Sequence, residues 1–161
     1  WQSVNHTKVN TLGQEVDITL DLENVFNASG NATLSRRGRS TFTVSYCHLH
    51  QNKDEKEYLQ SQYSLEYLRH KLTAQLKLHL VARLDWLGSY RYQDRMGSYT
   101  DTQGTVCDYH PYSVVDSRLS WTADTYSIYI DANNLTGHRY VDYGNVPQPG
   151  AWFKAGFKYS F

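Results

Sequence analysis

Apolar and polar residues alternate along most of this chain with a period of two. Residues 151–161 show the pattern most clearly. One set of alternate positions is Phe153, Ala155, Phe157, Tyr159 and Phe161, and the other is Trp152, Lys154, Gly156, Lys158 and Ser160. Because successive side chains of a strand point to opposite faces, the pattern predicts a strand with one apolar and one polar face.

The same period predicts further strands, at residues 14–22, 40–50, 84–95, 113–121 and 126–133. Residues 58–80 are ambiguous. Leu65, Leu68 and Leu72 follow a helical spacing, which would imply a soluble α+β domain, but alternate residues from Leu72 to Leu80 are apolar. We favour one long strand here, with a bulge near Leu68.

Polar segments separate these strands, at residues 23–39, 51–57, 96–112 and 135–150, with a tight connection at 122–125. The order predicts an all-β, antiparallel up-and-down meander of about seven strands. In its second half short and long connections alternate, as they do in outer-membrane barrels with short periplasmic turns and long external loops. Trp121, Tyr126 and Phe161 would then lie at the periplasmic rim.

Composition narrows the class of protein. The 161 residues suffice for one domain, and the formal net charge of +0 argues against a nucleic-acid-binding protein. The 14 tyrosines suit strands and a boundary between water and lipid. The mean hydropathy of -0.65 and the lack of a long apolar run exclude a membrane-spanning helix but not a spanning barrel. The start at Trp1 indicates a mature or truncated product.

Few residues suggest catalysis or metal binding. Glu15, Asp17 and Asp21 share one strand face, which we interpret as a solvated barrel lumen. His48 and His50 share one side of a strand, but the neighbouring sequence offers no third ligand, so no metal site is predicted. The chain has no nucleophile-elbow, zinc-protease or phosphate-loop motif, and we expect no enzyme and no cofactor.

A family resemblance spans most of the chain and is strongest from about Ser113 onward. The segments Asp-Ala-Asn-Asn-Leu-Thr-Gly-His-Arg-Tyr at 131–140, Tyr-Gly-Asn-Val-Pro-Gln-Pro-Gly at 143–150 and the strand at 152–161 resemble the end of a TonB-dependent outer-membrane receptor. Asn-Thr-Leu-Gly-Gln-Glu at 10–15 is similar to a strand opening of the same family. The Gly-Asn-Val-Pro-Gln-Pro-Gly form resembles Bacteroidetes-type receptors for cobalamin or iron chelates.

The resemblance implies a barrel of roughly 22 strands with a plugged lumen. Residues 1–161 would be its C-terminal portion, without plug domain or TonB-contacting box. An eight-stranded small barrel, with residues 2–10 as an extra strand, is the other architecture considered. The partners implied are outer-membrane lipid, the remainder of the same barrel and its plug domain, the inner-membrane TonB complex through the missing N-terminal part, and the barrel-assembly machinery. The implied location is the bacterial cell outer membrane.

The implied function is uptake of a scarce nutrient, cobalamin or iron as siderophore or haem. The expected ligand-binding residues of the external loops are Tyr99, Asp101, Tyr109, His138 and Arg139. The expected assembly signal consists of Phe153, Phe157, Tyr159 and Phe161. The alternative is a soluble secreted β-domain that binds carbohydrate or protein, supported by the alternation and by N-x-[ST] sequons at Asn5, Asn27, Asn31 and Asn134.

Cys47 and Cys107 allow a single disulfide at most. Strand parity places Cys47 on the lumen face, and Cys107 lies in a predicted external loop. We therefore hypothesise that the two thiols approach each other outside the membrane.

Overall fold

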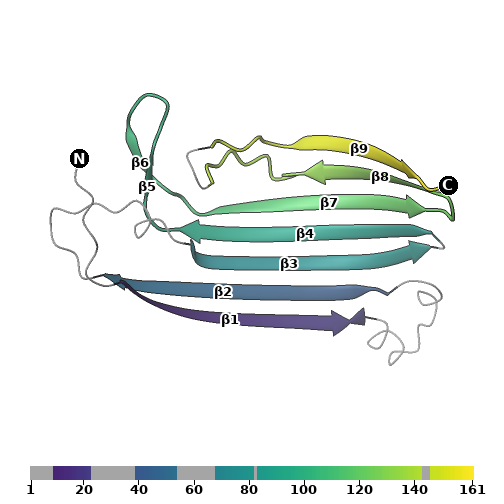
Figure 1. Cartoon of the computed structure of the whole chain (residues 1–161), viewed down its shortest axis with the longest axis horizontal. Helices are drawn as coiled ribbons and strands as arrows, with labels where there is room; N and C mark the ends of the chain where they lie inside the picture. The colour runs from purple at the N-terminus through teal and green to yellow at the C-terminus, as the bar shows by residue number, and fades with distance from the viewer. Residues whose placement is uncertain (1–8, 23–38, 54–67, 82, 143–145) are drawn as a thin grey trace.

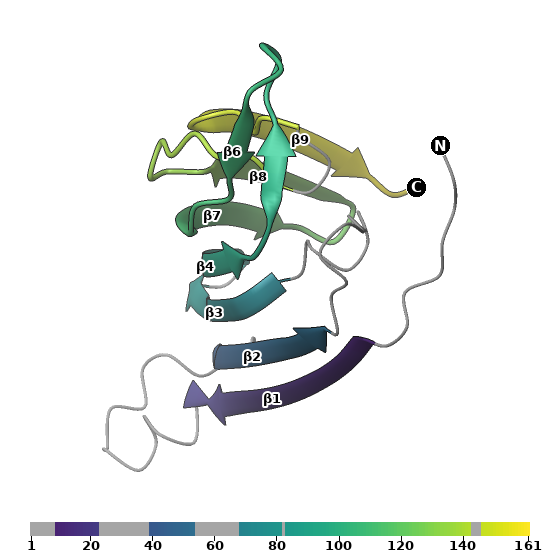
Figure 2. The same cartoon turned by 90° about the vertical axis from the view of Figure 1, so that its left-hand side faces the viewer.

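The computed structural model describes residues 9–22, 39–53, 68–81, 83–142 and 146–161. Seven strands form one antiparallel sheet in the order β1-β2-β3-β4-β7-β8-β9, and a separate hairpin pairs β5 with β6. Figures 1 and 2 show the seven strands side by side in one curved layer, with the β5–β6 hairpin projecting beyond it. The strands are β1 (Val9–Asp21), β2 (Thr41–Lys53), β3 (Leu68–Val81), β4 (Leu84–Arg95), β5 (Ser98–Thr100), β6 (Val106–Asp108), β7 (Tyr112–Thr122), β8 (Tyr126–Asn133) and β9 (Trp152–Tyr159). The all-β meander predicted from the alternation is confirmed.

The strand register joins the apolar positions of all seven strands into one face, the apolar face. One row runs across five strands through directly paired residues: Leu78, Trp86, Leu119, Ile130 and Ala155. A second row includes Leu20, Phe42 and Leu76, so β1 and β2 continue the same surface. A slip of one residue between any two strands would mix the faces, so this register is the one that keeps them separate.

The apolar face is open to its surroundings. Its side chains keep large exposed fractions, including 56% at Val16, 55% at Ile130 and 65% at Phe157. Phe153 is 70% exposed, although its cross-strand partner in β8, Ala132, is also apolar. Within the described residues, each strand of the sheet makes its extensive contacts with its sheet neighbours. The described residues therefore provide no covering layer for this face.

Most of the buried strand residues lie instead on the opposite, polar face, and Asp94, which is buried opposite His70, is an exception. Tyr112, Val114 and Asp131 keep only 6%, 2% and 4% of their surfaces exposed, and all three alternate away from the apolar face. Most of these buried residues lie at one end of the sheet. There the segment between β8 and β9 folds back onto β7, and the Leu135 N–H donates a hydrogen bond to the Val115 carbonyl (2.8 Å). The arrangement inverts the usual order of a soluble sheet, in which the apolar side is covered.

The connections differ between the two ends of the sheet. Short turns join β3 to β4 and β7 to β8, while residues 96–111 and 134–151 connect strands at the opposite end, here called the loop end. The tight connection predicted at 122–125 is confirmed, and the Ser160 N–H bonds to the Thr125 carbonyl (2.8 Å) beside it. Figure 1 accordingly places the C-terminus at the short-turn end, beside the turn between β7 and β8. The β1–β2 connection departs from the asymmetry, because it is long and lies at the short-turn end.

Several boundaries differ from the sequence-based expectation. β1 begins at Val9 and β2 ends at Lys53, where a loop was expected, because these two residues pair and extend the ladder. Residues 9 and 10 therefore belong to β1, and the rest of the extra strand considered at 2–10 lies outside the described residues. The segment expected to be a loop at 96–112 contains the β5–β6 hairpin. The register shifts between Leu68 and His70, close to the predicted bulge, and residues 58–67 lie outside the described part.

The sheet has two free edges. β1 and β9 each pair with one strand, and in the described residues they do not pair with each other. The sheet is therefore an open, curved layer in this part of the chain (Figure 2).

Candidate binding cleft at the loop end of the sheet

The β5–β6 hairpin forms one wall of a cleft at the loop end. Asp101 organises its turn, since Oδ1 accepts hydrogen bonds from the backbone N–H groups of Gln103 and Thr105 (both 2.8 Å). Gly104 completes the turn with φ of 84°, a left-handed conformation that glycine adopts without strain. Asp101 was expected to contact a ligand, but in the structure its carboxylate holds the hairpin turn and does not line the cleft.

Asn134 anchors the opposite wall, the segment between β8 and β9. Its side-chain Nδ2 donates to the carbonyls of His138 and Pro149 (both 2.8 Å), and its Oδ1 accepts from the Thr136 hydroxyl (2.8 Å). The Asn134 N–H bonds to Asp116 Oδ1 (2.7 Å), and the residue is 3% exposed with φ of 50°. Asparagine tolerates that conformation better than most residues. The Asn134 sequon therefore has a buried, fully bonded amide, and the other three sequons lie outside the described residues.

Between these walls lies a cleft of about 170 Å³. Four of the five residues expected to bind a ligand line it: Tyr99, Tyr109, His138 and Arg139. The sequence placed them in two separate loops, and the fold brings the loops together. The remaining lining residues are Asp108, His110, Pro111, Tyr112, Tyr140, Val141 and Pro147.

Stacked tyrosines form the floor and sides of the cleft. The rings of Tyr112 and Tyr140 are stacked with centroids 4.0 Å apart, and those of Tyr99 and Tyr109 lie 5.2 Å apart at a tilt of 40°. Tyr109 and Tyr112 are almost fully buried, at 8% and 6% exposed. Aromatic pairs of this kind hold rigid apolar surface in place with little loss of side-chain freedom.

Two arginines support this aromatic floor from β4. Arg91 Nη2 donates to the Tyr140 hydroxyl (3.1 Å), and Arg95 Nη2 to Asp142 Oδ1 (3.3 Å). The guanidinium of Arg95 also lies 5.9 Å from the ring centre of Tyr109. Each arginine thus ties the returning segment or the hairpin to the polar face of the sheet.

The Tyr112 phenol is held in its neutral form. Burial raises its pKa well above the ordinary value, and the nearby Asp142 carboxylate raises it further. The neutral hydroxyl donates a hydrogen bond to Gln93 Oε1, which is also buried. Tyr112 therefore acts as a fixed structural donor beneath the cleft.

The rim of the cleft has a different character. His110, His138 and Arg139 are exposed, so their polar groups face the solvent at the mouth. An aromatic floor with imidazole and guanidinium groups at its rim can bind a ligand by stacking and can pair with negative charge.

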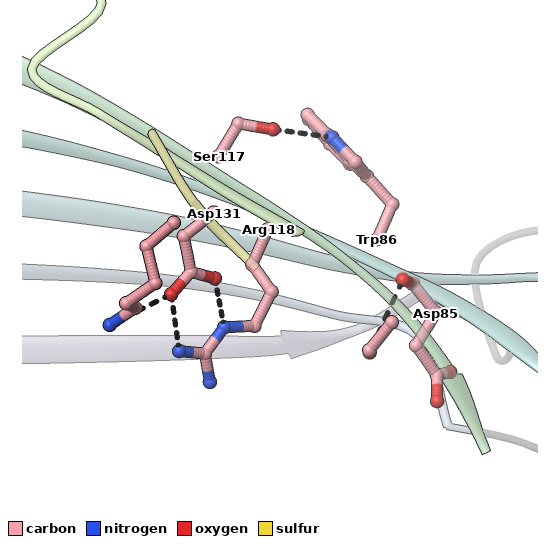
Figure 3. Close-up of polar contacts among 7 residues, drawn as sticks. Asp85, Trp86, Ser117, Arg118 and Asp131 are labelled. Atoms are coloured by element: carbon pink, nitrogen blue, oxygen red, sulfur yellow. Dashed lines mark hydrogen bonds and ion pairs between the residues drawn. The ribbon is translucent and has the colours of Figure 1, made fainter. Parts of the chain in front are cut away.

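A second polar cluster lies nearer the middle of the polar face. Arg118 Nε and Nη2 reach the two carboxylate oxygens of Asp131 at 2.5 and 2.8 Å, and Lys154 Nζ lies 3.0 Å from Asp131 Oδ2. Figure 3 shows this cluster on the opposite side of the strands from Trp86 and Ser117. The paired register of Arg118, Asp131 and Lys154 on neighbouring strands creates it. The ionic partner of Arg118 is Asp131 of the neighbouring strand, because the register places that carboxylate directly opposite.

On the apolar side, Trp86 lies against the sheet. Its Nε1 donates to Ser117 Oγ (2.9 Å), as Figure 3 shows. A Cβ added at Gly88 would lie 2.6 Å from Trp86 Cη2, so the glycine leaves the space that the indole occupies. The indole N–H is thereby satisfied and the ring presents carbon to the apolar face.

The described residues hold no group of three or more His, Cys, Asp or Glu placed to bind a metal ion. His48 lies beside His70 of β3, a neighbour that the local sequence did not reveal.

The hypothesis that Cys47 approaches Cys107 is wrong, because both are free thiols. Cys47 lies on the polar face, as parity predicted, and pairs with Glu15 and Lys71, whereas Cys107 belongs to the projecting β5–β6 hairpin.

Sequence reasoning missed the supports of the cleft: Arg91, Arg95, Tyr112, Asn134 and Tyr140. No local signal separates Tyr112 and Tyr140 from the other tyrosines, since their stacking arises only when two distant segments fold together. Asn134 had a usable signal, because an asparagine directly after a strand and before a Thr-Gly pair suits a left-handed turn.

Comparison of the chain with protein-family models, with curated proteins and with solved structures finds no match. Among the described residues, no helix has the length and apolar character needed to cross a membrane.

Proposed function

We propose that this chain forms part of the wall of a bacterial outer-membrane β-barrel of the TonB-dependent receptor class. In this proposal the apolar face meets lipid and the polar face lines the lumen. The cleft at the loop end belongs to the external surface that captures a nutrient for uptake.

The observation that carries the proposal is the distribution of burial between the two faces. Soluble monomers rarely expose contiguous apolar patches larger than a few hundred Å². Here an apolar face spans seven strands and is not covered by any of the described residues, while buried residues such as Val114 and Asp131 lie on the polar side. A transmembrane barrel requires this arrangement, with apolar side chains outward and polar ones inward.

Aromatic residues border the apolar face at both ends. Tyr46 and Tyr92 lie in one row toward the loop end, each paired with Leu72 of the strand between them. Tyr126 and Tyr159 pair directly at the short-turn end. Amphipathic rings at two levels suit the two boundaries between lipid and water. The rows between them are mainly apolar, with Leu, Ile, Val and Ala beside Phe42, Trp86 and Phe157, as a hydrocarbon layer requires.

The lengths of the connections then indicate which end of the sheet faces the periplasm and which faces outward. Barrels of this class have short turns on the periplasmic side and longer loops outside. The turns after β3 and β7 would be periplasmic, and the cleft lined by Tyr99 and Arg139 would be external. The long β1–β2 connection would be an exception on the periplasmic side.

The open edges support membership in a larger barrel. An unpaired strand edge in lipid leaves backbone N–H and C=O groups without partners, at several kcal/mol each. β1 and β9 would therefore pair with strands of the remaining barrel wall, which also closes the lumen around a plug domain.

The resemblance favours cobalamin, or iron bound as a siderophore or haem, as the nutrient. At about 170 Å³ the cleft would contact only part of such a ligand, through the flat apolar surface of its stacked tyrosines and the polar groups of Arg139 and His138 at the mouth. Uptake of the bound nutrient would require the inner-membrane TonB complex, acting through the N-terminal part of the full-length protein.

Fractionation of cells that produce the protein tests the proposal. We expect it in the outer-membrane pellet, released only by detergent, and we expect deletion of its gene to reduce uptake of cobalamin, a ferric siderophore or haem. Recovery in the soluble fraction without detergent would favour the alternative, a secreted β-domain that binds carbohydrate or protein and whose partner covers the apolar face.

A further inference from the structure

Two histidines on neighbouring strands lie face to face at the loop end of the apolar face. His48 of β2 is the direct cross-strand partner of His70 of β3. Their imidazole rings are stacked, with centroids 4.7 Å apart and planes 21° apart. The sequence showed only the pair His48 and His50 on one strand, and the antiparallel register supplies the second, closer imidazole.

A hydrogen bond orients one of the two rings. The hydroxyl of Tyr46 lies 2.8 Å from Nδ1 of His70. Histidines that bind metals commonly use one ring nitrogen for the metal and the other for a hydrogen bond that fixes ring and tautomer. In the tautomer that donates from Nδ1 to Tyr46, the lone pair of His70 Nε2 is free to bind an ion.

The surroundings of the pair are compatible with a cation. Gln14 is the direct partner of His48 in β1 and is exposed, so its amide oxygen lies in the same row. Of the cations that flank His70, Arg69 is bound to Asp94 (2.5 Å) and Lys71 alternates to the polar face. His48 and His70 are both partly exposed, which lets water complete a coordination shell.

We propose that His48 and His70 form a two-imidazole site for a divalent first-row transition-metal ion, such as Zn²⁺, Ni²⁺ or Cu²⁺. Imidazole nitrogen suits these ions, while carboxylate and carbonyl oxygen suit Mg²⁺ and Ca²⁺. Because each Nε2 lone pair lies in the plane of its ring, the two stacked rings must turn out of the stack before both Nε2 atoms converge on one ion. The ion then joins β2 to β3 beyond the Tyr46 row, where water has access. The site does not depend on the proposed function.

Titration of the purified, chelator-stripped chain with Ni²⁺ in a calorimeter tests the site. We expect His48→Gln and His70→Gln each to weaken Ni²⁺ binding at least tenfold, because each removes one of two ligands. Tyr46→Phe should weaken it by about tenfold, the lower end of the range for loss of an orienting bond. His50→Gln is the matched control, on the same strand and side but two residues from the pair, and should bind as the wild type does.

A second readout separates binding from folding. A bound ion should raise the unfolding midpoint of the wild type and of His50→Gln, since it binds the folded state, and leave His70→Gln unchanged. Far-UV circular dichroism checks that each variant keeps the sheet. The proposal is overturned if the wild type binds no Ni²⁺, if both histidine variants bind like the wild type, or if His50→Gln weakens binding as much as they do.

Discussion

The ring of Tyr129 in β8 occupies the space beside Gly156 in β9, its direct cross-strand partner. A Cβ added to Gly156 would overlap the ring. The guanidinium of Arg118 lies over the same ring, 4.8 Å from its centre, and binds the buried carboxylate of Asp131. Gly156, Tyr129 and Arg118 therefore form one continuous contact across three strands on the polar face.

We expect Gly156→Ala to displace the Tyr129 ring and to lower the free energy of unfolding by about 1–3 kcal/mol, as overpacking does. Gly150→Ala is the control, because its Cβ would meet only the Gly137 carbonyl at an ordinary 3.6 Å and should change stability by less than about 0.5 kcal/mol. Denaturant titration of both variants measures the difference. Equal stability of the two variants would show that Tyr129 moves away without loss.

Asn134→Ala should open the segment between β8 and β9. The change removes side-chain bonds to Thr136, His138 and Pro149 and leaves buried groups unpaired, at roughly 1–3 kcal/mol. Amide hydrogen exchange across 135–150 should therefore accelerate.

The neighbouring Asn133→Ala is a matched control for this prediction. Asn133 Nδ2 is buried and has no hydrogen-bond partner among the described residues, so its removal should leave exchange in 135–150 nearly unchanged. If both variants accelerate exchange equally, Asn134 is not the anchor of the segment.

The two faces should respond differently to charge. Leu76→Arg places a cation on the apolar face near its middle, and we expect a loss of about 2–4 kcal/mol on folding into lipid vesicles. Gln75→Arg, one residue earlier on the polar face, should cost far less. Asp131→Asn is unsuitable as the polar-face control, because it would leave Arg118 and Lys154 without their shared carboxylate. Equal losses at positions 75 and 76 would contradict the assignment of faces.

Phe161 tests the hypothesis of an assembly signal. Its ring is fully exposed in the structure, beyond the end of β9, so deleting it should lower the stability of folded protein only slightly. We expect the deletion to depress assembly in cells much more strongly, because a terminal aromatic strand can pair with an exposed edge of the assembly machinery. Heat-modifiable gel mobility of outer-membrane fractions, beside unfolding in vitro, compares the two effects. A matching fall in both would mean that β9 is only a wall strand.

The sequence predicts the sheet better than it predicts the site. Alternation assigned Ile128, Phe157 and their neighbours to one face, and the register confirms that assignment, because side-chain parity is a local property of a strand. The start of β1 at Val9 was missed, since the polar Asn10 and Thr11 interrupt the pattern while the β2 ladder still pairs with them.

The contacts of the candidate sites were not predictable in the same way. The stacking of Tyr112 on Tyr140, the pairing of Arg118 with Asp131 and the approach of His48 to His70 all join residues on different elements. Each contact depends on the register between strands or on a loop that folds back onto the sheet. The local spacing of residues encodes neither. The expected cleft residues came together because both loops leave the same end of a meander, and Asp101 did not because its carboxylate is bound within its own turn.

The central claim is that the apolar face meets lipid, and nitroxide scanning of β3 tests it most directly. Spin labels would be attached one at a time to cysteines at positions 72 to 78, with Cys47 and Cys107 replaced by serine, in the protein reconstituted into vesicles. We predict that labels at 72, 74, 76 and 78 collide with oxygen dissolved in the bilayer, and that labels at 73, 75 and 77 collide with a water-soluble nickel complex. Collisions with the nickel complex at the even positions, or no alternation at all, would contradict the account.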